Sequence, residues 1–160
     1  MNILFLCTGN SCRSILAEAI FNSLAPAGMH AISAGSKPSE NVHPRSIALL
    51  KKKGIATDGY YSKSWDSLPV TPDVVITVCG NAAGETCPAY LGKVMRAYWG
   101  VADPAMAMGT DAEIDAAFEK AYLILRKRIE FFLALKIDHF KPPEALAQQL
   151  QLIGLIGVNV

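Results

Sequence analysis

The sequence predicts an α/β fold, a three-layer, doubly wound sheet of four parallel strands with helices on both faces. Short apolar runs that end in turns are typical of buried parallel strands. These runs alternate along the chain with segments of helical periodicity, which is the order of βαβ units. A chain of 160 residues that is 51% hydrophobic is long enough for one core and too short for two ordinary domains.

The predicted strands are four apolar runs: Asn2–Leu6, Met29–Ala34, Asp73–Val78 and Val94–Trp99. The predicted helices are four segments with apolar residues at helical spacing: Ser14–Leu24, Pro44–Lys53, a long helix that begins at Thr110, and Glu144–Ile153. Asn41 or His43 is expected near the start of the second helix. Thr110 and Glu113 form the pattern of a capping box, which fixes the start of the long helix. The polar, turn-rich stretches 57–72 and 80–91 are predicted loops.

Composition excludes several classes of protein. A net charge of +1 argues against a broad nucleic-acid-binding surface. No stretch approaches eighteen uninterrupted apolar residues, so we expect no membrane span, and the first residues lack the pattern of a signal peptide. We therefore expect a cytoplasmic protein, in which the 4 cysteines are redox or catalytic groups. Metal binding is not expected, because the three histidines lie far from the cysteine pairs and the cysteine spacings are not those of zinc ligands.

The loop between the first strand and the first helix is the candidate active site. Its residues are Cys7, Thr8, Gly9, Asn10, Ser11, Cys12 and Arg13. A tight turn before a helix N-terminus directs backbone N–H groups at an anion. Arg13 can donate two hydrogen bonds to a tetrahedral oxyanion, and Cys7 can attack it as a nucleophile. We expect Cys7 to be a thiolate at neutral pH, supported by the loop amides, Arg13 and the Ser14 hydroxyl.

The stretch CTGNSCRS, with Asp103-Pro104 downstream, resembles the low-molecular-weight tyrosine phosphatase superfamily. Cys79 and Cys87, in VITVCGNAAGETCP, and the later WGVADPA resemble the arsenate reductases of that superfamily. The resemblance covers roughly Met1 to Leu135. It implies the low-molecular-weight phosphatase fold and a role in arsenic detoxification.

The resemblance implies a relay of three cysteines. Cys7 attacks arsenate and Asp103 protonates the leaving oxygen. Cys79 then attacks Cys7, which releases arsenite, and Cys87 attacks Cys79 and passes the disulfide to a carrier. No tightly bound cofactor is implied; the reducing equivalents come from thioredoxin or from glutathione with glutaredoxin.

The spacing of the second cysteine pair constrains that relay. In one continuous helix, eight residues would separate the two Cα atoms by about 12 Å, whereas a disulfide tolerates at most ~7 Å. The segment between Cys79 and Cys87 must therefore loop, which Gly80 and Gly84 facilitate. Family members commonly have these cysteines one residue closer, so this departure leaves the carrier open.

Two further features have alternative interpretations. Cys12 is either a packed small residue, which we favour, or a partner of Cys7 in a protective disulfide of the kind found in the related phosphatases. Asn10, Glu18, Ser33 and Asp66 resemble a monovalent-cation site, with potassium as its ion. Their other interpretation is a set of hydrogen bonds that stabilises the loop. Trp99 is expected in the core rather than at the substrate.

Two other functions remain as alternatives. A low-molecular-weight tyrosine phosphatase would need only Cys7, Arg13 and Asp103; it leaves Cys79 and Cys87 without a role and favours an aromatic residue where this chain has Ala105. A non-enzymatic oxyanion-binding protein would have an inert Cys7. Weak residual phosphatase activity is compatible with the reductase.

Pro142-Pro143 separates a single catalytic domain, residues 1–140, from a C-terminal extension, residues 141–160. The apolar extension either packs on the domain or meets a second subunit. A monomer is expected rather than a dimer.

Overall fold

The computed structural model describes residues 1–79, 94–136 and 143–157. Its strands are β1 (Asn2–Leu6), β2 (His30–Ala34), β3 (Val74–Thr77) and β4 (Met95–Tyr98). The helices of this part of the chain are α1 (Arg13–Leu24), α2 (Pro44–Lys52), α4 (Asp111–Ala134) and α5 (Pro143–Ile153), with a 3₁₀ turn, η2 (Pro104–Met106). The four strands form one parallel sheet in the order β2-β1-β3-β4, which confirms the predicted fold class.

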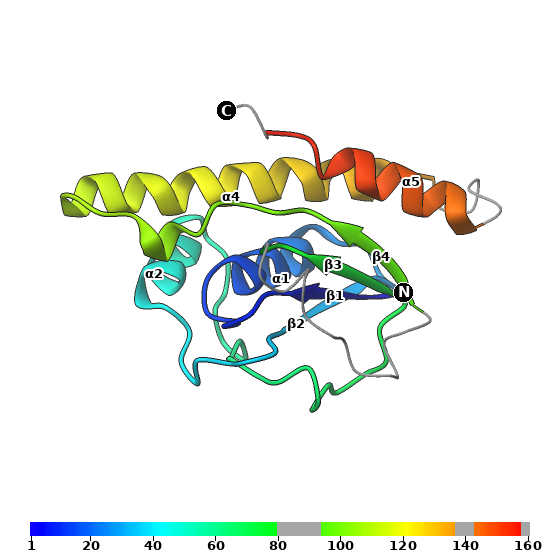
Figure 1. Cartoon of the computed structure of the whole chain (residues 1–160), viewed down its shortest axis with the longest axis horizontal. Coiled ribbons are helices and arrows are strands. Elements are labelled where there is room, and N and C mark those ends of the chain that lie inside the picture. Colours follow the sequence, from blue (N-terminus) through cyan, green and yellow to red (C-terminus); the bar gives the residue numbers. More distant parts are fainter. Residues whose placement is uncertain (80–93, 137–142, 158–160) are drawn as a thin grey trace.

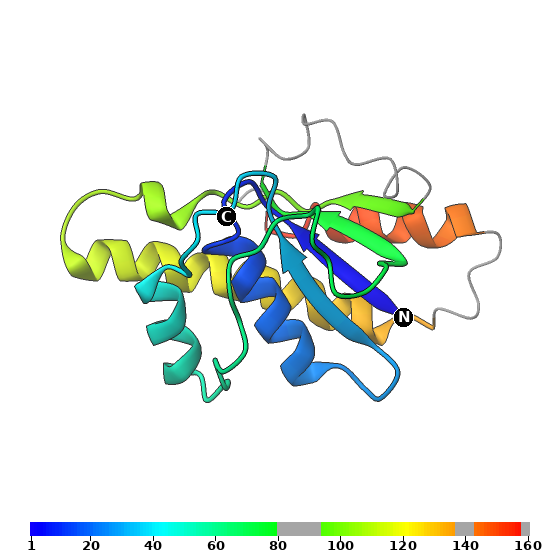
Figure 2. The same cartoon turned by 90° about the horizontal axis from the view of Figure 1, so that it is seen from below.

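The helices pack around this sheet in a fixed arrangement (Figures 1 and 2). Helix α1 packs on β1 and β2, and α4 packs on α1 and α2. Helix α5 lies beside the edge strand β4 and contacts α4. The core between these layers contains a chain of aromatic rings in contact, Phe5, Phe21, Phe132 and Trp99. Trp99 is fully buried, which confirms its predicted place in the core.

The predicted boundaries are close to the observed ones. Thr110 and Glu113 form the expected capping box at the start of α4. His43 is the N-cap of α2, and its Nδ1 accepts a hydrogen bond from the Arg45 N–H. Helix α1 begins at Arg13, one residue before the predicted start, and Cys12 caps it without a side-chain hydrogen bond. No helix in the described ranges is long and apolar enough to cross a membrane.

The register of the sheet determines where the site lies. Leu6 of β1 pairs with Ala34 of β2 and with Thr77 of β3. The chain leaves all three strands at the same edge, so Cys7 and Cys79 follow neighbouring strand ends. This carboxyl edge of a parallel sheet is where α/β proteins bind ligands.

Candidate active site

The loop from Cys7 to Arg13 has its carbonyl groups directed away from its centre. The Thr8 oxygen accepts from Lys37 N, the Gly9 oxygen from Ser39 N and the Ser11 oxygen from His43 N, at 2.9–3.0 Å. In a planar trans peptide the N–H points opposite to the C=O. The N–H groups that follow these carbonyls therefore point to the inside of the loop. This arrangement forms a cradle for an anion.

Gly35 allows the loop to pack closely against the end of β2. A Cβ atom at this position would lie 2.3 Å from the Thr8 carbonyl oxygen. Gly35 N donates to the Lys63 carbonyl, and Trp65 N donates to the Gly35 carbonyl. The sequence indicated only that Gly35 closes a strand, whereas the structure makes it a part of the wall of the site.

Asn10 fixes the backbone of the loop. Its φ of 48° is in the left-handed region, and its side chain is completely buried. The Asn10 amide donates to Ser14 Oγ at 2.8 Å and to Ser33 Oγ at 2.9 Å. Its oxygen accepts from Lys63 N at 2.8 Å. Asn10 therefore connects the loop to α1, to β2 and to the segment after Tyr61, and its side-chain amide is not free to bind substrate.

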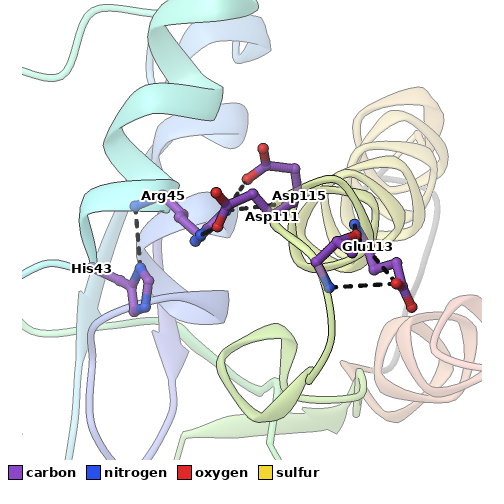
Figure 3. Close-up of polar contacts among 6 residues, drawn as sticks. His43, Arg45, Asp111, Glu113 and Asp115 are labelled. Atoms are coloured by element: carbon purple, nitrogen blue, oxygen red, sulfur yellow. Dashed lines mark hydrogen bonds and ion pairs between the residues drawn. The ribbon is translucent and has the colours of Figure 1, made fainter.

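A cluster of charges at the start of α2 supports the loop from outside (Figure 3). Arg45 forms ion pairs with Asp111 and Asp115 and so connects the N-termini of α2 and α4. The ring of His43 lies 5.0 Å from that of Phe118. Since His43 N also donates to the Ser11 carbonyl, this cluster connects α4 to the loop. The sequence did not indicate this support, which depends on residues nearly 70 positions apart.

Arg13 connects the loop to the segment after β4. Its Nη1 donates to the Val101 carbonyl at 2.9 Å, and its Nη2 lies 3.3 Å from Asp103 Oδ2. Among the described residues, the buried Arg13 Nε has no hydrogen-bond partner. A buried donor without a partner is costly, so a bound oxyanion would stabilise it. The predicted pairing of Arg13 with the anion cradle fits this geometry.

Asp103 is held at the rim by its own turn. Its Oδ1 accepts from Ala105 N at 3.0 Å, which caps η2, and its Oδ2 faces Arg13. The side chain is one-third exposed (33%), so it lies where a proton could pass from solvent to a bound oxyanion. Residues Cys7, Arg13 and Asp103, predicted from two separate parts of the sequence, thus lie around one loop.

Cys79 lies over the same loop. Its Sγ accepts from Thr8 N at 3.2 Å and lies 3.5 Å from Thr8 Oγ1. The hydrogen bond between the Cys7 and Cys79 side chains, followed by burial, raises the pKa of Cys7, and Arg13 opposes this change. Cys7 and Cys12 are free thiols. Cys87 lies outside the described residues.

The raised pKa corrects one expectation. A Cys7 that is ionised at neutral pH was expected from Arg13 and the loop amides alone. With the Cys79 thiol as its hydrogen-bond partner, and with both side chains buried, the protonated form of Cys7 is favoured. The expectation is therefore wrong for this arrangement of the two thiols.

Cys12 faces the interior beside Ser11. It is 4% exposed, and burial raises its pKa. Its position at the start of α1 fits the interpretation as a packed small residue. The Ser11 hydroxyl lies 3.7 Å from its sulfur.

Three of the four residues of the predicted cation site, Asn10, Glu18 and Ser33, are joined by hydrogen bonds. Ser33 Oγ donates to Glu18 Oε1 at 2.5 Å and accepts from Asn10, whereas Asp66 is exposed and its N–H donates to Ser64 Oγ. The Lys63 ammonium lies 3.8 Å from Glu18 Oε1, and both side chains are buried. Sequence reasoning missed Lys63; its place between two serines in a polar stretch gave no signal. No group of three metal-binding side chains occurs among the described residues.

Comparison with known proteins agrees with this geometry. Residues 2–149 match the family described as low molecular weight phosphotyrosine protein phosphatase. The arsenate reductase of Halalkalibacterium halodurans is 39% identical over 131 residues, which are 81% of this chain and 93% of that protein.

Solved structures give the same result. A structure described as an arsenate reductase in the phosphate binding state has a TM-score of 0.68 and 28% identity, over 83% of this chain and 96% of that one. The thioredoxin-dependent arsenate reductase of Corynebacterium glutamicum has a TM-score of 0.55 and 26% identity, over 81% of this chain and 61% of that one. The chain therefore belongs to the low-molecular-weight phosphotyrosine protein phosphatase family, and these three relatives are named arsenate reductases.

Proposed function

We propose that this protein is a cytoplasmic arsenate reductase that converts arsenate to arsenite in arsenic detoxification. The observation that carries the proposal is the position of Cys79, whose sulfur is hydrogen-bonded to Thr8 N and to Cys7. A hydrolase of this family has no use for a second thiol at that place. A reductase needs it there, because thiol–disulfide exchange requires one sulfur to reach another.

The first step joins Cys7 to arsenic. The Cys7 sulfur attacks arsenic(V), which is held by the inward N–H groups of the loop and by Arg13, and the proton of its thiol passes to the Asp103 carboxylate. Asp103 gives this proton to one oxygen, which leaves as water, and a Cys7–arsenic bond replaces it. Proton transfer of this kind contributes about 10²- to 10⁴-fold in rate. Arg13 stabilises the charge of the arsenate oxygens during this exchange.

The second step transfers two electrons. The Cys79 thiolate attacks Cys7 Sγ, a Cys7–Cys79 disulfide forms and the sulfur–arsenic bond breaks. The bonding electron pair goes to arsenic, which leaves as arsenite. Cys87 then attacks Cys79, restores the Cys7 thiol and leaves a Cys79–Cys87 disulfide. A dithiol carrier reduces that disulfide.

Thioredoxin is the carrier we favour, because one neighbour at 26% identity is described as thioredoxin-dependent. Glutathione with glutaredoxin is the other candidate. The decisive experiment compares arsenite production with thioredoxin and thioredoxin reductase against production with glutathione and glutaredoxin, using the wild type and Cys79→Ser. Production that needs one carrier and Cys79 supports the proposal; p-nitrophenyl phosphate hydrolysis without arsenite from either carrier would make the chain a phosphatase.

The phosphatase alternative has one observation in its favour, since Cys7, Arg13 and Asp103 are the groups that hydrolysis needs and all three surround the loop. Ala105 after Asp103-Pro104 is exposed and offers no aromatic ring for a tyrosine substrate. Weak phosphatase activity beside arsenate reduction is therefore part of the proposal.

Residues 1–140 are proposed as the catalytic domain, residues 141–160 as an extension, and the protein as a monomer.

For the monovalent cation, the Lys63 ammonium beside Glu18 supports a site whose positive charge comes from the chain itself. Potassium is then not required.

A further inference from the structure

Arg128 of α4 is a buried charge with an unusual set of partners. Its side chain is 1% exposed. Among the described residues it forms no ion pair with a carboxylate, and its hydrogen bonds go to backbone carbonyl groups. A buried guanidinium needs such acceptors, since burial without them is costly.

The acceptors come from two separate parts of the chain. Arg128 Nη1 donates to the Trp99 carbonyl at 2.7 Å and to the Gly100 carbonyl at 3.3 Å, and both belong to the loop after β4. Arg128 Nε donates to the Ile156 carbonyl at 2.9 Å, beyond the end of α5. The arginine therefore connects the loop 99–103 to the C-terminal segment.

The C-terminal segment also contacts that loop directly. The Trp99 indole N–H donates to the Leu150 carbonyl at 2.7 Å, and Gln151 Oε1 accepts from Tyr98 N at 3.0 Å. Gly154 packs so closely that a Cβ atom would lie 2.3 Å from the Tyr98 carbonyl oxygen. Helix α5 thus covers the free edge of β4 and the base of the loop.

The loop 99–103 positions two groups of the proposed active site, Arg13 and Asp103. Val101 N donates to the Val78 carbonyl at 3.1 Å, and the Val101 carbonyl accepts from Arg13. Asp103, two residues on, pairs with Arg13. A displacement of this loop therefore moves the acceptor of Arg13 and the proton donor together.

We propose that Arg128 is a positioning residue for Asp103 and Arg13, and that the C-terminal segment 143–157 completes the site in which it acts. The catalytic part of this inference rests on the proposed function. Its structural part, the restraint of residues 99–105 by Arg128 and the C-terminal segment, does not depend on the substrate.

The first test is hydrogen–deuterium exchange on full-length protein. Arg128→Met should speed exchange of peptides that cover 99–105 by about tenfold or more, because buried acceptors lose their donor. Gly154→Ala, which keeps Arg128 but pushes the C-terminal segment away, should have the same effect there. Arg126→Met, on the exposed side of α4, and Leu152→Ala, on the exposed side of α5, are the matched controls and should leave 99–105 unchanged.

The second test is kinetic. Arg128→Met should lower kcat for arsenate reduction by about 10- to 10²-fold, as a misplaced catalytic group does. If Arg128 acts partly through Asp103, the loss from Arg128→Met should be smaller in the Asp103→Asn background than in the wild type. An equal loss in both backgrounds would show that Arg128 does not act through Asp103.

A wild type that makes no arsenite would refute the proposed function. The exchange experiment would then still test, without any activity, whether Arg128 and the C-terminal segment restrain residues 99–105. If Arg128→Met is too unstable to assay, Gly154→Ala carries the test. Unchanged exchange of residues 99–105 in Gly154→Ala would overturn the inference whatever the activity.

Discussion

The backbone N–H of Thr8 donates to Cys79 Sγ at 3.2 Å, so the second thiol lies on the loop that is expected to hold the oxyanion. Thr8 directly follows Cys7, so this contact places the Cys79 sulfur beside the residue that it would attack in the relay.

The pairing of the Cys7 and Cys79 thiols predicts how Cys7 titrates. The hydrogen bond with Cys79 is the largest cause that raises the pKa of Cys7. Cys79→Ala removes it, so the pKa of Cys7 should fall and alkylation by iodoacetamide should begin at lower pH. Arg13→Gln removes the group that lowers this pKa, so its profile should move to higher pH. Mass spectrometry of the Cys7 peptide measures both, and equal midpoints in wild type and Cys79→Ala would contradict the assigned cause.

Asp103 is expected to act in the chemical step more than in binding. Asp103→Asn keeps the shape of the side chain but removes its proton donor and its ion pair with Arg13. We expect single-turnover formation of arsenite to slow by about 10²-fold or more. The dissociation constant for phosphate, measured by calorimetry, should change little, because Arg13 keeps its bond to Val101. An unchanged single-turnover rate would remove Asp103 from the reaction.

Much of this site could be predicted from the sequence, because its reactive side chains belong to short sequence motifs. Cys7 and Arg13 belong to one short loop, and the apolar run in Asp73–Val78 predicts the buried strand that the structure has at Val74–Thr77. Two parallel strands that end in cysteines predict neighbouring thiols at one sheet edge, and the register of β1 with β3 confirms that edge.

Other features could not be predicted because they arise from packing between distant segments. Lys63 lies in a polar stretch that resembles any surface loop, yet its side chain is buried and faces Glu18. The pKa of Cys7 depends on a contact with Cys79 whose geometry no spacing reveals. Arg128 lies on the buried face of α4, and nothing in the sequence around it indicates its link to Ile156.

Asn10 is expected to stabilise the loop rather than bind substrate. Asn10→Ala removes hydrogen bonds to Ser14 Oγ, Ser33 Oγ and Lys63 N, so these buried polar groups lose a partner, although Ser33 keeps its bond to Glu18. We expect a loss of about 2–3 kcal/mol in the free energy of unfolding, measured in urea. Asn41→Ala, at an exposed position, is the control and should lie within about 0.5 kcal/mol of wild type. Equal stability of the two variants would show that the network contributes nothing.

The pairing of Lys63 with Glu18 predicts that the stability of a variant without Lys63 depends on pH. Burial raises the pKa of Glu18, and Lys63 lowers it. Lys63→Met should raise that pKa further, so the folded state binds the Glu18 proton more tightly than the unfolded state does. Stability of the variant is then greatest below the ordinary pKa of glutamate, about 4.3, and is lost as pH rises through the higher folded pKa.

Thermal unfolding of Lys63→Met at several pH values measures this loss. Glu18→Gln in the same chain should abolish the pH dependence. Potassium chloride should raise the melting temperature of Lys63→Met more than choline chloride of equal ionic strength, and should not do so for the wild type. A wild type that is stabilised by potassium in particular would show that the Lys63 ammonium does not supply the charge of the site.

If the relay operates, the variants Cys79→Ser and Cys87→Ser should stop at different steps of the reaction. Cys87→Ser should stop after one turnover with a Cys7–Cys79 disulfide, because no thiol remains to attack Cys79. Cys79→Ser should stop earlier, with arsenic still bound to Cys7, because nothing breaks the sulfur–arsenic bond. Neither residue takes part in phosphoester hydrolysis, so both variants should keep any activity toward p-nitrophenyl phosphate.

Quenched single-turnover samples, digested and mapped for disulfides by mass spectrometry, distinguish these states. Cys12→Ser is the matched control, because it removes a buried loop thiol that the relay does not use; it should retain multiple turnovers if its loop folds, which phosphate binding reports. Since Cys79 Sγ lies on the amide of Thr8, which directly follows Cys7, the Cys7–Cys79 disulfide should be the first to appear in the time course. Multiple turnovers of arsenate reduction by both Cys79→Ser and Cys87→Ser would refute the relay, and hydrolysis by Cys7, Arg13 and Asp103 would then be the better account of this site.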